Sequence, residues 1–177
     1  MRQVVLLRGV NLGPRNRVPM GALRELLMAA GFIDVRTYLQ SGNVILSGGA
    51  GANVLASRCR ELIASKFGLE IEVLVRTRDE LAAIVAGNPL GDVASDPKRY
   101  QVSFLQRELD SSAVAELAAL AVEGEQLVAS GRELYAWHPH GIGRSKLSAG
   151  LAARSLPVVA TARNWATTTS LLALADE

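Results

Sequence analysis

Arginine residues are concentrated in the first part of this sequence, before its first acidic residue, Glu25. Residues 1–24 contain five arginines and no aspartate or glutamate. Three of the five, Arg8, Arg15 and Arg17, lie in the polar stretch LLRGVNLGPRNRVP (residues 6–19). Guanidinium groups bind carboxylates and phosphates through charge-assisted hydrogen bonds. The stretch therefore indicates either a segment that binds an anionic ligand or arginines that pair with distant acidic residues such as Glu70 and Glu72.

A second basic region lies near the other end of the chain. Residues 134–175 contain four basic residues and no acidic one. GIGRSKL (residues 141–147) and TARNW (residues 161–165) each lead into a predicted helix, with Ser145 and Asn164 as expected N-caps. Because helix N-termini attract anions, we predict ligand-binding roles here for Gly143, Arg144, Ser145, Lys146, Thr161, Arg163 and Asn164.

Other patterns of reactive residues are weak. His138 and His140 lie close together in WHPHG, but no further ligands complete a metal site, and we interpret both as turn residues. Ser41 and Ser145 lack a neighbouring base that spacing alone would reveal. No phosphate-loop motif is present. Aromatic residues make up 5% of the chain, which disfavours a sheet that stacks RNA bases.

The composition is typical of a folded protein. Hydrophobic residues form 49% and charged residues 20% of the 177 residues. No apolar run reaches the roughly 18 residues of a membrane span, so we expect no membrane partner. The single cysteine, Cys59, excludes an intrachain disulfide and favours a cytoplasmic location. Its apolar neighbours at helical spacing predict that it is buried.

Hydrophobic periodicity predicts the same order of elements twice. In the first half we expect strands and helices in the order βαββαβ, over residues 2–8, 20–30, 33–39, 44–46, 52–67 and 69–76. A helix over residues 78–87 and a Pro/Gly/Asp-rich link over residues 88–98 follow. The second half repeats the order over residues 100–106, 111–121, 126–129, 132–137, 145–154 and 157–161, and a last helix spans residues 165–175. The predicted class is thus α+β, with two ferredoxin-like βαββαβ halves plus a C-terminal helix, divided into residues 1–87 and 88–177.

This topology predicts that two loops of the first half meet. In a βαββαβ unit, the connection from the first strand to the first helix lies at the same end of the sheet as the turn between the second and third strands. Here these segments are residues 8–18 and 40–43. We therefore predict that one site contains Arg8, Asn11, Arg15, Asn16, Arg17, Gln40, Ser41, Gly42 and Asn43.

Four blocks, LLRGVNLGPRNRVPM, TYLQSGNVILS, GIGRSKL and TARNWATTTSLLAL, resemble the bacterial family catalogued as domain of unknown function 1697. The resemblance covers nearly the whole chain and implies a compact α/β protein with ferredoxin-like halves. It implies no activity. Pro14 and Ala166 depart from the family pattern, in which glycine and asparagine are usual, and alanine at position 166 has no side-chain amide to contact a ligand.

Together these patterns predict a cytoplasmic protein that binds a phosphate-bearing anion, either a nucleotide or a nucleic-acid backbone. Two alternatives stay open. One is an enzyme that holds a phosphorylated substrate with the same groups, and the other is a docking module for an acidic protein. We expect no cofactor and no metal. The sequence does not decide whether the two basic ends form one site or two.

Overall fold

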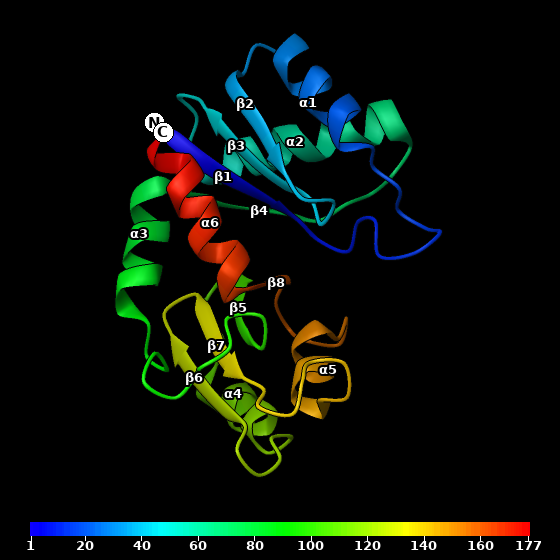
Figure 1. Ribbon diagram of the computed structural model, residues 1–177. Helices are drawn as coiled ribbons and strands as arrows, with labels where there is room; N and C mark the ends of the chain where they lie inside the picture. Colours follow the sequence, from blue (N-terminus) through cyan, green and yellow to red (C-terminus); the bar gives the residue numbers. More distant parts are fainter. The chain divides into compact units, whose positions relative to one another are not determined.

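Two four-stranded antiparallel sheets form the framework of the computed structural model, which describes all residues from 1 to 177 (Figure 1). The sheets belong to two compact units. Unit 1 comprises Met1–Ala83 with Leu171–Glu177, and unit 2 comprises Ile84–Ser170. The predicted α+β class with two similar ferredoxin-like halves is confirmed.

Unit 1 is built on the strand order β2-β3-β1-β4. Its elements are β1 (Arg2–Leu7), α1 (Met20–Ala29), β2 (Ile33–Tyr38), β3 (Asn43–Ser47), α2 (Ala52–Phe67) and β4 (Val73–Thr77). Helices α1 and α2 lie over one face of this sheet (Figure 1). Alternate residues of the central strand β1, Val5 and Leu7, pack there with Leu23 of α1 and Ile63 of α2. The period-two and period-3.6 patterns of the sequence thus meet in one core.

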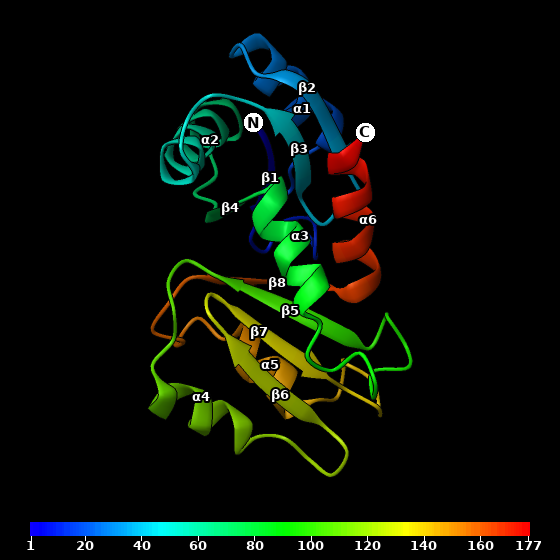
Figure 2. The ribbon, with the colours of Figure 1, turned by 90° about the vertical axis from the view of Figure 1, so that its left-hand side faces the viewer.

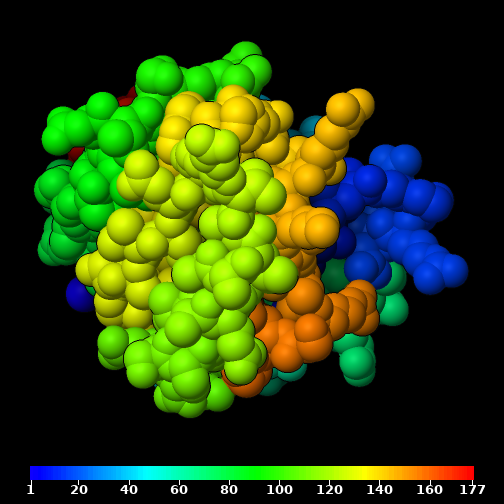
Figure 3. All heavy atoms as spheres, turned by 90° about the horizontal axis from the view of Figure 1, so that it is seen from below, coloured from blue at the N-terminus to red at the C-terminus, as the bar shows by residue number.

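Unit 2 repeats the arrangement with the strand order β6-β7-β5-β8. Its elements are β5 (Tyr100–Leu105), α4 (Ser111–Ala118), β6 (Gln126–Ser130), β7 (Glu133–Trp137), α5 (Lys146–Ala152) and β8 (Ala160–Asn164). Helices α4 and α5 pack on the same face of this sheet (Figure 2). Leu117 of α4 and Leu147 of α5 share a core there with Leu105 and Leu134. The two helices and their loops form a continuous surface, yellow-green to orange in Figure 3.

Two further helices, α3 (Arg78–Gly87) and α6 (Trp165–Asp176), each contribute residues to both units. Asp176 at the end of α6 accepts a 2.6 Å hydrogen bond from Nε of Arg78, and both residues belong to unit 1. None of the helices is long and apolar enough to cross a membrane.

Several predicted boundaries are wrong, because the ladders between strands decide where pairing starts. The strand predicted over residues 69–76 begins only at Val73, since its ladder with β1 ends where Leu7 pairs with Val73. The strand predicted over residues 157–161 spans Ala160–Asn164, opposite Leu105 to Gln101 of β5. Helices α4 and α5 are each shorter than predicted.

Candidate anion-binding site

The two loops that the topology predicts to meet in unit 1 are joined by one side chain. Nδ2 of Asn11 lies 2.8 Å from the carbonyl oxygen of Gln40 and 2.9 Å from that of Val18. Oδ1 of Asn11 accepts a hydrogen bond of 2.9 Å from the Val18 amide. The Asn11 side chain therefore connects the two ends of the loop at residues 8–18 by hydrogen bonds. It also connects this loop to the turn at residues 39–42. We call these two segments together the basic loop pair.

The backbone of the basic loop pair is held in an uncommon conformation. Asn11, Asn16 and Leu39 have φ values of 56°, 53° and 57°. Asparagine tolerates this left-handed region, whereas leucine rarely adopts it. The Asn11 amide also donates to the Asn16 carbonyl oxygen over 3.1 Å. These contacts hold the backbone of the loop in one shape, so the backbone needs little further ordering when a ligand arrives.

Gly42 allows the turn to approach the strand beside it. A Cβ atom at this position would lie 2.6 Å from Cγ2 of Val10 and 2.7 Å from Cβ of Leu7. Its φ of 83° also favours glycine. The Leu7 amide donates a 2.8 Å hydrogen bond to the Gly42 carbonyl oxygen. Glycine is therefore required at position 42 by the packing of the turn.

Ser41 and Asn43 shape the same turn from inside. The Asn43 side chain is fully buried, and its Nδ2 donates to the Tyr38 carbonyl oxygen at 2.8 Å and to Oγ of Ser41 at 3.0 Å. The side-chain amide of Asn43 is therefore not exposed, as its predicted contact with a ligand would require. The side chain of Gln40 is exposed at the tip of the turn.

The arginines of the basic loop pair differ in exposure. Arg15 and Arg17 are exposed, and neither takes part in an ion pair or hydrogen bond. Arg8 is half-buried at the base of the loop, where its amide donates to the Glu72 carbonyl oxygen over 2.9 Å. The sequence stretch therefore presents two guanidinium groups to solvent.

In unit 2, several residues of the predicted site make hydrogen bonds within the protein. Ser145 and Asn164 are N-caps, as predicted: Oγ of Ser145 accepts from the Ser148 amide at 3.0 Å, and Oδ1 of Asn164 accepts from the Thr167 amide at 2.8 Å. The two caps thus already accept hydrogen bonds from the Ser148 and Thr167 amides, which belong to the N-terminal amides that would otherwise bind an anion. Arg144, Lys146 and Gly143 are exposed around the start of α5, but this helix has only seven residues.

Arg163 is wrongly placed by the sequence analysis, which assigned it to a loop. It lies within β8 with 7% of its surface exposed, and its guanidinium donates to Oγ1 of Thr161 and to the Ala162 carbonyl oxygen, each over 2.8 Å. Burial lowers the pKa of Arg163 to about 10. Thr161 is buried as well, with 6% exposed. Both side chains are buried, on the face of β8 opposite the core residue Ala160.

Sequence analysis missed a buried polar network in unit 2 that is centred on His138. His138 opens the turn to Gly141, as predicted, since its carbonyl oxygen accepts a 3.0 Å hydrogen bond from the Gly141 amide, but its side chain is fully buried. Its Nδ1 lies 3.0 Å from Oε1 of Glu125, whose side chain is 2% exposed, and its Nε2 lies 3.1 Å from Oε1 of Gln101. Oγ of Ser148 also donates to that Gln101 oxygen, over 3.3 Å. The network links β5, the turn before β6, the end of β7 and α5.

The Glu125 carboxylate is the anionic centre of this network. Burial by itself raises the pKa of Glu125. Hydrogen bonds from Ser145, His138 and the Val122 amide, together with attraction to His138, outweigh burial and leave the pKa below its ordinary value of 4.5. Ser145 thus contacts a weakly basic carboxylate and also caps α5, which gives no support to Ser145 as a nucleophile. The burial of His138 could have been predicted from the alternation in ELYAWH, which places this residue on the core face with Leu134 and Ala136.

Comparison with known families decides the classification. The sequence model described as "Protein of unknown function (DUF1697)" matches residues 1–135. The chain belongs to the DUF1697 family. The matched region includes the whole basic loop pair of unit 1 and ends before His138.

Among solved structures, the conserved bacterial protein SP0830 from Streptococcus pneumoniae is similar over 98% of both chains, with a TM-score of 0.78 and 21% sequence identity. At this identity the likeness establishes the shared fold of this DUF1697 member and nothing of its activity. No functionally curated protein matches the chain.

Proposed function

We propose that the protein binds the phosphate backbone of a nucleic acid through the basic loop pair of unit 1. The observation that carries this proposal is the pair Arg15 and Arg17, which are exposed without an acidic partner on a loop that Asn11 fastens to the neighbouring turn. Guanidinium groups suit phosphate oxygens, because each can donate two parallel hydrogen bonds.

Exposure favours a polyanion over a single nucleotide. Proteins enclose nucleotides and other small ligands in concave pockets that bury most of the ligand surface. Arg15 and Arg17 are instead open to solvent, as are phosphate-contacting side chains that lie along a backbone. Such contacts position a protein on nucleic acid without reading its sequence.

Binding should be tested by fluorescence anisotropy with a labelled single strand and with its duplex, between about 50 and 200 mM salt. We expect affinity to fall steeply with salt. The double substitution Arg15→Ala and Arg17→Ala should lower the slope of log K against log salt by about two, since each phosphate contact contributes about one. The melting temperature should stay near that of the wild type.

A matched control removes the same charge elsewhere in unit 1. Arg58 and Arg60 of α2 are half-exposed and already pair with Glu61 and Glu72, so their double substitution by alanine should leave the slope unchanged. Equal losses in both double variants would show that only net charge matters, and the proposal would be wrong. It would also be wrong if the wild-type chain bound neither nucleic acid at about 50 mM salt.

A further inference from the structure

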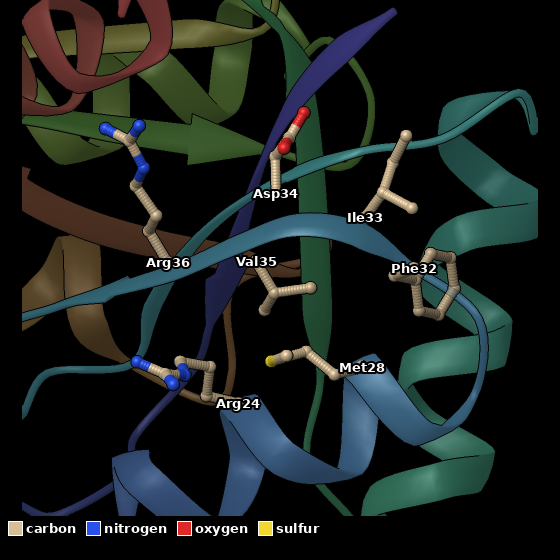
Figure 4. Close-up of a pocket in the computed structure, with 7 residues that line it drawn as sticks. All are labelled: Arg24, Met28, Phe32, Ile33, Asp34, Val35 and Arg36. Atoms are coloured by element: carbon tan, nitrogen blue, oxygen red, sulfur yellow. The ribbon is translucent and has the colours of Figure 1, made fainter.

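A hollow of about 470 Å³ lies between α1 and the edge strand β2 of unit 1 (Figure 4). The hollow is open to solvent along α1, where Arg24 and half of the Met28 surface are exposed. The lining consists of two arginines, one acid and four apolar residues, namely Arg24, Met28, Phe32, Ile33, Asp34, Val35 and Arg36. It is separate from the basic loop pair, and the inference below does not depend on the proposed function.

A bulge in β2 arranges the charges around this hollow. Pairing with β3 shifts between Ile33 and Arg36, and Asp34 has a φ of 53°. Asp34 and Arg36 project from the side of β2 opposite Met28 and Val35 (Figure 4). Both are already engaged: Asp34 with Arg2 at 3.7 Å, and Arg36 with the Glu177 carboxylate. Their charges therefore do not point into the gap between α1 and β2.

The gap itself is lined by apolar groups. Met28 of α1 and Val35 of β2 face one another across it, with Phe32 at one end (Figure 4). Val35 is buried at 8% exposed, whereas 51% of the Met28 surface is in contact with water. Covering such apolar surface removes it from water and is therefore favourable.

A single cation lies at the other end of this apolar strip. Arg24 is one helical turn before Met28, so the two side chains share a face of α1. Arg24 is exposed and takes part in no ion pair. One guanidinium at the end of an apolar strip complements a ligand with one negative end and an aliphatic body. A cationic amphiphile is repelled there, and a compact anion leaves the strip uncovered.

We propose that this hollow binds a single-chain aliphatic carboxylate. The chain lies along Met28, Val35 and Phe32, and the carboxylate accepts hydrogen bonds from the Arg24 guanidinium. No covalent step is involved.

Methionine methyl NMR of the full chain with decanoate tests this assignment below the micelle-forming concentration. The protein has three methionines, and they differ in environment: Met28 lines the hollow, Met20 is 6% exposed in the core, and Met1 is 79% exposed. Decanoate should shift the Met28 methyl signal in a saturable way and leave those of Met1 and Met20 unchanged. Decanol should bind at least about tenfold more weakly, because it lacks the charge-assisted hydrogen bond.

Arg24→Gln should weaken decanoate binding about tenfold without changing the melting temperature, and Arg58→Gln on α2 should leave it unchanged. The proposal is overturned if decanol binds as well as decanoate, or if Arg58→Gln and Arg24→Gln have equal effects. It is overturned as well if an acidic, leucine-containing peptide shifts the Met28 signal and decanoate does not.

Discussion

Removal of the Glu125 carboxylate is expected to destabilise unit 2 strongly. Glu125 and His138 are 2% and 0% exposed and lie 3.0 Å apart. Glu125→Ala leaves Nδ1 of His138 and the Ser145 hydroxyl without their acceptor inside the protein. Breaking a buried pair by removing one partner costs about 3–5 kcal/mol. We therefore expect the free energy of unfolding of unit 2 to fall by about 3–5 kcal/mol, a large share of a typical domain's stability.

The assay is urea denaturation followed by tryptophan fluorescence. Both tryptophans, Trp137 and Trp165, belong to unit 2, so the signal reports that unit. Glu123→Ala is the matched control, because it removes the same charge from an exposed side chain in the same turn. The control should change stability by no more than about 0.5 kcal/mol.

The pH dependence supplies a second readout, with Glu125→Gln as the isosteric variant. The folded-state pKa of Glu125 lies below 4.5. The carboxylate therefore stabilises the fold fully above pH 4.5, and this stabilisation is lost as the pH falls through the folded-state pKa. The stability difference between the wild type and Glu125→Gln should narrow as the solution is acidified.

A double-mutant cycle with His138→Gln decides whether the two side chains act as a pair. If they do, the double variant loses clearly less than the sum of the two single losses. Additive losses, or a loss below about 1 kcal/mol for Glu125→Ala, would refute the reasoning that the network stabilises unit 2.

Three smaller tests follow from other positions. Gly42→Ala should destabilise unit 1 by about 1–3 kcal/mol, because the new Cβ would lie 2.6 Å from Val10, whereas Gly13→Ala, with open space around it, should not; equal melting temperatures would contradict this. Asn11→Ala should speed hydrogen exchange of the Val18 amide, which loses its 2.9 Å acceptor. Unchanged protection of this amide would show that the loop keeps its conformation without the Asn11 side chain. Burial raises the pKa of Cys59 to about 12, so Ellman's reagent should modify the native protein at about pH 8 only as fast as it unfolds; rapid modification would show that the thiol is accessible.

The sequence predicted most accurately the features that local interactions determine. The bounds of α2 (Ala52–Phe67) and α3 (Arg78–Gly87) agree with the predicted helices, because helical spacing of apolar residues is a local signal. Ser145 and Asn164 were identified as caps for the same reason, since a cap bonds to an amide only three residues away.

The meeting of residues 8–18 with the turn at residues 39–42 was predictable although about 30 positions separate them. It follows from the βαββαβ order of elements, which places both segments at one end of the sheet. The identity of the contact was not predictable: the sequence suggested that Asn11 and Asn43 face a ligand, whereas both amides bond to backbone or side chains of the loop pair itself.

Burial of charged and polar groups was decided only by the tertiary structure. Arg163 lies in a strand and not in a loop because the ladder with β5 runs from Ala160 to Asn164, beyond the predicted residues. His138 is interior because Glu125 and Gln101, which are 13 and 37 positions away, converge on its ring. A strand's register and a polar group's partners are set by contacts between distant segments, and a stretch of sequence carries no record of them.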